Sequence, residues 1–137
     1  MNIWKNIIVI TAINAAIFSS CQENIDSRAE REAKEFTRKN CPTPIIDNTR
    51  TDSLVFEANT RTLHYYYTLV GPADNNIAFT GRHEELKKIL ISSFRSSTNL
   101  KMYIDAGINF KLTYHSEKKP QQKLYETILT AEELSGK

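Results

Sequence analysis

Cysteine and histidine are residues that often act as nucleophiles, bases or metal ligands, and this 137-residue sequence has five of them: Cys21, Cys41, His64, His83 and His115. A zinc-binding helix needs two histidines four residues apart with a glutamate after the first, and no pair here has that spacing. The sequence also lacks a glycine-flanked nucleophilic serine, a phosphate-binding glycine loop and a cysteine-protease motif. We therefore predict no catalytic residue, no metal site and no cofactor, and the sequence does not identify the residues that bind a partner.

Residues that are far apart in the sequence can still meet in a fold. His64 and His115 each fall on a strand face that we expect to be turned to solvent, so a shared site is one alternative. Ordinary surface histidines are the other alternative and the one we expect. For Cys41 we expect a buried small apolar residue, with a free thiol as the alternative.

The charge of the chain excludes one class of partner. There are 18 basic and 16 acidic residues, which gives a net charge of +2, and no run of five or six like charges occurs. This balance does not support binding to nucleic acid. The length and the 40% content of hydrophobic residues are typical of a single globular domain with one modest core.

The first twenty residues have the parts of a secretory signal. A short polar start with Lys5 precedes an apolar run from residue 7 to residue 18, and Ser19 and Ser20 follow it. The apolar run is too short to span a bilayer, because a helix needs roughly 20 residues to cross the hydrocarbon core. Cys21 comes directly after the two serines.

The segment Phe18-Ser19-Ser20-Cys21 resembles the lipobox of bacterial lipoproteins. The resemblance implies a signal peptide over residues 1–20, acylation of Cys21, which would become the first residue after cleavage, and an acylated tether over residues 21–24. Two or three acyl chains anchor a protein stably in a membrane. Gln22 stands where aspartate would retain a lipoprotein in the inner membrane, so the resemblance implies the outer membrane, on either its periplasmic or its surface face. The alternative is an ordinary secretory signal, with Cys21 kept as a thiol that could pair with Cys41.

The pattern of apolar residues after the tether predicts helices and strands in a mixed order. Helical spacing predicts a helix over residues 25–39, started by Asp26 or Ser27, and a second helix from about residue 81 to residue 96. Alternation predicts a β-hairpin over residues 51–70 and another over residues 108–129. A short helical turn is expected before Gly107, and Thr130 with Glu133 resembles a capping box.

Together these elements predict an α+β domain over residues 25–137. It has an N-terminal helix, then two β-hairpins separated by a helix, which form a four-stranded antiparallel sheet packed against the helices. On the central strand, Tyr65 and Tyr67 point to one face and His64 and Tyr66 to the other. We expect Tyr65 and Tyr67 to pack in the core, with a platform for an aromatic ligand as the alternative.

Four segments of the domain carry a second resemblance: Cys41-Pro42, residues 49–53, residues 65–67 and residues 105–108. They are similar to segments of small uncharacterised exported lipoproteins of Bacteroides-like bacteria, over roughly residues 40–134. The resemblance supports the order hairpin, helix, hairpin, and it brings no established activity with it.

The function we expect is that of a lipid-anchored interaction or accessory module of the cell envelope. It would contact the membrane through its N-terminal lipid, have a protein partner in the envelope, and be no enzyme. Two alternatives stay open at this stage. One is an inhibitor or immunity-type protein that blocks a secreted enzyme, and the other is a small envelope enzyme with no recognisable motif.

Overall fold

The structure is a computed structural model, and it describes residues 23–136. The predicted signal peptide and Cys21 lie outside the described residues. In chain order the elements are α2 (Ile25–Asn40), β1 (Thr49–Glu57), η1 (Ala58–Thr60), β2 (Thr62–Leu69), η2 (Gly71–Ala73), η3 (Asn76–Phe79), α3 (His83–Arg95), α4 (Lys101–Asp105), β3 (Asn109–Ser116), β4 (Lys123–Leu129) and α5 (Ala131–Ser135). The predicted helices and strands are confirmed, with ends that differ by a few residues. None of the described helices has the length and the apolar character that a membrane span requires.

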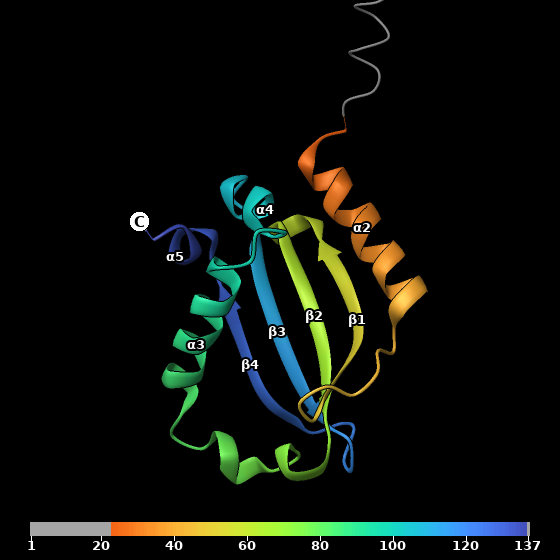
Figure 1. The fold of residues 1–137 in the computed structure, drawn as a ribbon, viewed down its shortest axis with the longest axis vertical. Coiled ribbons are helices and arrows are strands. Elements are labelled where there is room, and N and C mark those ends of the chain that lie inside the picture. Colours follow the sequence, from red (N-terminus) through yellow and green to blue (C-terminus); the bar gives the residue numbers. More distant parts are fainter. Residues whose placement is uncertain (1–22, 137) are drawn as a thin grey trace, which may run out of the picture.

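The four strands form one sheet in the order β1-β2-β3-β4 (Figure 1). Both predicted hairpins are confirmed, because β1 pairs with β2 and β3 pairs with β4 in antiparallel fashion. The prediction of a purely antiparallel sheet is wrong, because β2 and β3 are parallel, with Thr62 opposite Asn109. The reason is the connection between them. Residues 70–108 carry α3 and α4 and return the chain to the end where β2 began, which is how parallel neighbours are joined.

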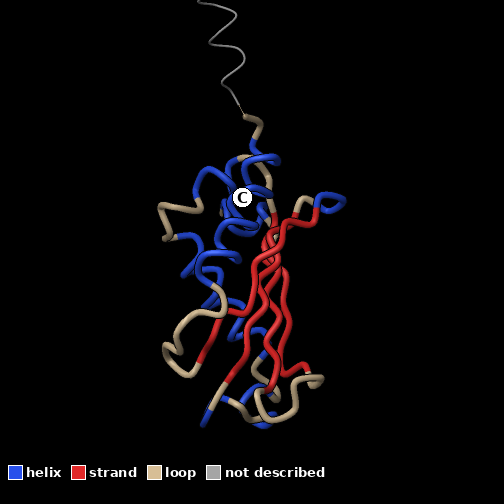
Figure 2. Tube along the Cα trace, turned by 90° about the vertical axis from the view of Figure 1, so that its right-hand side faces the viewer, coloured by secondary structure: helices blue, strands red, loops and turns tan. Residues whose placement is uncertain are grey.

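The helices lie on one side of the sheet, which Figure 2 shows nearly edge-on. The core forms between them and that face. Ala29 and Ala33 of α2, each 1% exposed, pack in one cluster with Leu63, Phe110 and Leu112 of the two central strands. Small alanines let α2 approach the sheet closely. The predicted alternation on β2 is therefore confirmed, with Leu63, Tyr65 and Tyr67 facing the helices.

The start of α2 differs from its prediction in one detail. Asn24 is the N-cap, and its Oδ1 accepts a hydrogen bond from the backbone N–H of Ser27 at 2.8 Å. Asp26, which was one of the two predicted caps, instead forms an ion pair with Arg61 at 2.8 Å. Glu23 is tied to Arg31 by a second ion pair at 2.9 Å. The ordered structure therefore begins before the helix itself.

Two predicted helix ends are confirmed. Gly107 follows α4 with a φ of +85°, a conformation that glycine adopts without strain. A Cβ at this position would also lie only 3.3 Å from the guanidinium of Arg61. At the start of α5, Thr130 and Glu133 form a complete capping box.

Candidate functional site

Three tyrosines stand side by side on the face of the sheet that the helices cover. Tyr65 and Tyr67 of β2 have ring centroids 5.9 Å apart, and Tyr67 stacks on Tyr114 of β3 at 4.7 Å. The parallel register places Tyr67 directly opposite Tyr114. We call Tyr65, Tyr67 and Tyr114 the tyrosine row. It crosses the middle of the sheet, where α2 and α3 leave the two central strands between them (Figure 1).

A cavity of about 330 Å³, the α2 cavity, adjoins the Tyr65 end of the row. Its lining is largely apolar and includes Phe36 of α2, Leu63 of β2 and Leu100 beside α4. One polar contact lies at its edge, where the hydroxyl of Tyr103 donates to the carboxylate of Glu32. The cavity has the character of a pocket for an apolar side chain.

A second cavity of about 190 Å³, the α3 cavity, adjoins Tyr114 at the other end of the row. Its lining residues are all apolar or aromatic: Leu69, Phe79, Leu86, Ile89, Leu90, Tyr114 and Tyr125. Ile89 is 57% exposed, which is unusual for an isoleucine beside an apolar cavity. No residue of α3 is fully buried. This wall of the cavity is therefore held by few contacts, and it can shift more easily than α2.

The hydroxyl groups of the tyrosine row have no hydrogen-bond partner among residues 23–136. None of the three forms a hydrogen bond with another described residue, and none is sealed away from solvent. Burial raises the pKa of Tyr65 and of Tyr114 to about 12, and it raises the pKa of Tyr67 as well. The three phenols therefore stay protonated at physiological pH, and the row offers three O–H donors together with the faces of its aromatic rings.

The opposite face of the sheet carries a closed polar network. Nε2 of His64 lies 2.7 Å from the hydroxyl of Thr113, and that hydroxyl donates to Glu126 at 2.6 Å. Nδ1 of His64 lies 3.2 Å from the carboxylate of Glu57. Tyr66 stacks on the imidazole with ring centroids 4.0 Å apart. His64 is only 4% exposed, so the prediction of an ordinary surface histidine is wrong for this residue. Both of its ring nitrogens have partners, so it has no free group to offer a ligand.

The other candidate residues do not join this network. His115 and His64 lie on the same face of the sheet, as predicted; we call this face, which the helices do not cover, the open face. His115 of β3 pairs with Thr68 of β2, which is four residues beyond His64. His83 packs against Tyr125 at the start of α3, with ring centroids 5.1 Å apart. Cys41 is a half-buried free thiol whose pKa is raised by burial. Within residues 23–136, no group of three or more histidine, cysteine or acidic side chains is arranged to hold a metal ion.

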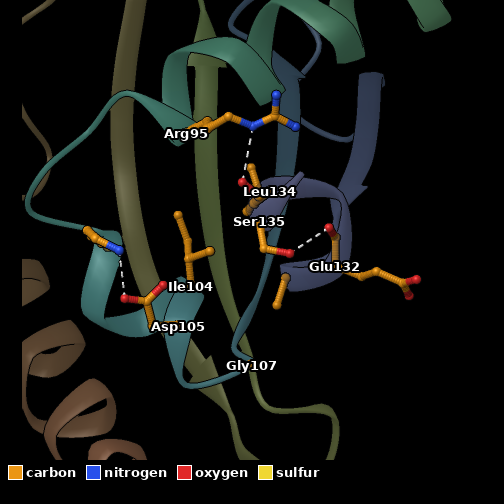
Figure 3. A pocket seen from close by; sticks show the side chains of 9 residues that line it. Arg95, Ile104, Asp105, Gly107, Glu132, Leu134 and Ser135 are labelled. Carbon is orange, nitrogen blue, oxygen red and sulfur yellow. Dashed lines mark hydrogen bonds and ion pairs between the residues drawn. The ribbon is translucent and has the colours of Figure 1, made fainter. Parts of the chain in front are cut away.

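A larger cavity of about 760 Å³ lies among the ends of α3, α4 and α5 (Figure 3). Arg95 donates from Nη2 to the carbonyl oxygen of Glu133 at 2.6 Å and from Nε to that of Leu134 at 3.1 Å. Lys101 pairs with Asp105 at 2.9 Å. Arg95 thus joins the end of α3 to α5, whereas the pair of Lys101 and Asp105 lies within α4.

The prediction that Tyr65 and Tyr67 pack in the core is confirmed in part, because both are half-buried and pack against the core cluster. Tyr65 also lines the α2 cavity. The contact between Tyr114 and Tyr67 was not predicted from the sequence, because an antiparallel pairing of the two hairpins does not bring these residues together. The available signal was the alternation of Phe110, Leu112 and Tyr114, which puts this tyrosine on the apolar face.

One family matches the chain over most of its length. A family model described as a domain of unknown function (DUF8479) matches residues 24–125. The matched segment runs from the N-cap of α2 into β4 and therefore contains the whole tyrosine row. No curated protein matches the sequence.

Three solved structures have a similar fold. A protein from Pseudomonas aeruginosa described as secreted has a TM-score of 0.66 and 14% identity, and the match covers 82% of this chain and 99% of that one. The pilotin EpsS of the Vibrio vulnificus type 2 secretion system has a TM-score of 0.58 and 13% identity, with 78% and 88% covered. The type II secretion system pilotin AspS from Vibrio cholerae has a TM-score of 0.58 and 16% identity, with 85% and 97% covered. At these low identities the similarity is one of fold.

Proposed function

The chain belongs to the DUF8479 family, and we propose that it is a lipid-anchored accessory protein of the cell envelope that holds a segment of a partner protein across the tyrosine row. The observation that carries the proposal is the row itself. Three tyrosine hydroxyls without partners lie between two apolar cavities on the face where a core would normally be closed. Tyrosine supplies a large contact area at a low cost in conformational entropy, which is why it is enriched at protein interfaces.

The chemistry of the row and the cavities defines the partner segment. Apolar side chains fill the α2 cavity and the α3 cavity, and carbonyl or carboxylate oxygens between them accept hydrogen bonds from the row. Such a segment is amphipathic, with its apolar side chains spaced to reach both ends of the row. The loosely held α3, which has no fully buried residue, adjusts the width of the site to the segment.

The anchor belongs to the same proposal. Cys21 carries the acyl chains, as its position after the serine pair indicates, and the protein is held in the outer membrane. Tethering raises the effective concentration of the domain beside other envelope proteins, so a modest affinity is enough for function. The shared fold of two secretion-system pilotins supports an accessory role of this kind.

Catalysis is not part of the proposal. The histidine in the most elaborate polar environment, His64, is buried with both ring nitrogens occupied. Burial raises the pKa of the Cys41 thiol, which disfavours the nucleophilic thiolate. Neither residue lines the α2 cavity or the α3 cavity.

The test uses two exposed isoleucines on opposite faces of the sheet. Ile89 borders the α3 cavity and is 57% exposed, whereas Ile128 lies on the open face and is 47% exposed. A photo-crosslinking amino acid replaces one or the other in the full-length protein in cells. We expect a covalent adduct with a specific protein from position 89 and none from position 128. Adducts from both positions or from position 128 alone would contradict the proposal.

The lipid anchor has a separate test. Cells grown with a labelled fatty acid should yield labelled protein, and Cys21→Ala should abolish the label. Cys41→Ala is the matched control, because it removes the other cysteine of the sequence and should leave labelling intact. Label that survives Cys21→Ala would disprove the anchor and leave the tyrosine row unaffected.

A further inference from the structure

The start of α2 is rigidly connected to the rest of the domain. Asn24 caps the helix, and the carboxylate of Glu23 binds Arg31 through two hydrogen bonds of 2.9 and 3.1 Å. The helix is in turn fixed to the sheet by Ala29 and Ala33. The start of α2 therefore has a defined position relative to the sheet.

Only Gln22 separates Glu23 from the proposed anchor at Cys21. Two residues of fully extended chain span at most about 7 Å. The inference made here rests on the proposed acylation of Cys21. Given that acylation, Glu23 is held within that distance of Cys21 and the first residue of α2, Ile25, within about 14 Å, so the domain has little freedom to turn away from the bilayer.

The end of the domain at the start of α2 has a composition suited to this position. Figure 1 shows that η1 and α4 lie at the same end as the start of α2. We call this the end face. Its charged side chains form four ion pairs: Arg28 with Glu32, Arg31 with Glu23, Arg61 with Asp26, and Lys101 with Asp105. The four basic and four acidic groups of these pairs contribute no net charge, and Met102, 37% exposed, is an apolar side chain on the end face.

We infer that the end face lies against the bilayer, so that the sheet stands upright on the membrane. The loops at the opposite end, which include η3, then point away from the lipid (Figure 1). Because Leu100 and Tyr103 close the α2 cavity on the side of α4, a partner segment reaches the tyrosine row from the side or from the far end. Because the basic groups of the end face are paired with carboxylates, we expect its contact with lipid to depend on the tether and on Met102, and not on anionic headgroups.

The test compares one position on the end face with one at the far end. Met102→Cys and Ile77→Cys, each in a Cys41→Ala background, are labelled with a fluorophore in the full-length acylated protein bound to phosphatidylcholine vesicles. Ile77 is 78% exposed in η3. Lipids with a spin-labelled headgroup should reduce the emission at position 102 and leave that at position 77 unchanged. Equal losses at both positions, or a larger loss at position 77, would overturn the inference.

Two controls make the result specific. A flexible Gly/Ser insert of about 20 residues after Gln22, with a root-mean-square length of about 25 Å, should remove the difference between the two positions. Phosphatidylglycerol in the vesicles should leave the difference unchanged, and a difference that appears only with this anionic lipid would contradict the neutral contact. The intact mass of the protein is measured first. An unmodified Cys21 would remove the anchor and this inference together, whereas equal quenching in acylated protein would overturn the orientation alone.

Discussion

The two faces of this sheet both carry tyrosine rings and hydroxyl groups, and they differ in what those groups contact. On the open face, Thr113 and His64 bond to each other and to two carboxylates, and Tyr66 covers the imidazole. On the helix face, the hydroxyls of the tyrosine row have no partner, and cavities lie on both sides. The polar groups of His64 and Thr113 are thus buried and bonded to one another, although Nδ1 of His115 on the same face is buried without a partner. The three tyrosines beneath the helices are only half-buried, and their hydroxyls have no partner among the described residues.

The largest difference in stability between the two faces is expected when a carboxylate replaces Tyr67 on the helix face or Tyr66 on the open face. Tyr67→Asp puts a carboxylate between two aromatic rings beside the core, and it should lower the free energy of unfolding by about 3 kcal/mol. Tyr66→Asp, on the open face, should cost about 1 kcal/mol. Urea unfolding of both variants measures the difference. Equal losses would mean that the two faces are equally enclosed.

Alkaline pH should destabilise the protein through the helix face. Burial raises the pKa of Tyr65 and of Tyr114 from 10.0 to about 12. The stability that comes from their protonated form is complete below pH 10.0 and is lost as the pH rises towards about 12. Replacing both residues by phenylalanine should therefore flatten the fall in the unfolding midpoint over this range. An unchanged fall would show that these two phenols are not enclosed.

The open face should respond to the loss of a single hydroxyl. Thr113→Val removes the group that links His64 to Glu126 and leaves polar atoms of both without a partner, at a cost of about 2 kcal/mol. Burial raises the pKa of Glu126, but hydrogen bonds from Thr113 and Lys123 outweigh it and lower the pKa below 4.5. The stability linked to this carboxylate is present above pH 4.5 and is lost as the pH falls through the lowered value. Acid titration of the unfolding midpoint should show this loss in the parent and less of it in Thr113→Val.

The smallest change in stability is expected from the matched substitution on the helix face. Tyr67→Phe also removes one hydroxyl, but that hydroxyl has no partner in the fold, so the free energy of unfolding should change by no more than about 0.5 kcal/mol. The yield of the photo-crosslinked adduct from position 89 should nevertheless fall. A loss of stability as large as that of Thr113→Val would show that the hydroxyl of Tyr67 serves the fold and not a partner.

The elements of the fold could be predicted from the sequence because their signals are local. Alternation along residues 62–69 and 109–116 and helical spacing along residues 25–40 each depend on neighbours within a few positions. The pairing of β2 with β3 could not be predicted in this way. It depends on how residues 70–108 return the chain, and no short pattern encodes that path.

The candidate site could not be predicted from the sequence for the same reason, because it depends on contacts between distant residues. The stacking of Tyr67 on Tyr114 joins residues 47 positions apart in the sequence, and it exists only in the parallel register. The free hydroxyls of the row could not be anticipated either, because the number of partners a hydroxyl finds is a property of the packed structure. By contrast, the face that carries the network was predicted, since His64 and His115 were expected on one side of the sheet, but the burial of His64 and Thr113 there was not.

The parallel pairing of β2 and β3 also has a consequence for the order in which the chain assembles. Each hairpin can close locally, because β1 and β2 are joined by the short η1 and β3 and β4 by a short turn. The contact between the hairpins must wait until a connection of nearly forty residues, from Val70 to Ile108, has been closed, with its cost in loop entropy. Refolding should therefore be slow for a domain of this size, on the scale of milliseconds to seconds, with the docking of two preformed hairpins as its barrier. Until that step is complete, the tyrosine row is divided between two unjoined halves.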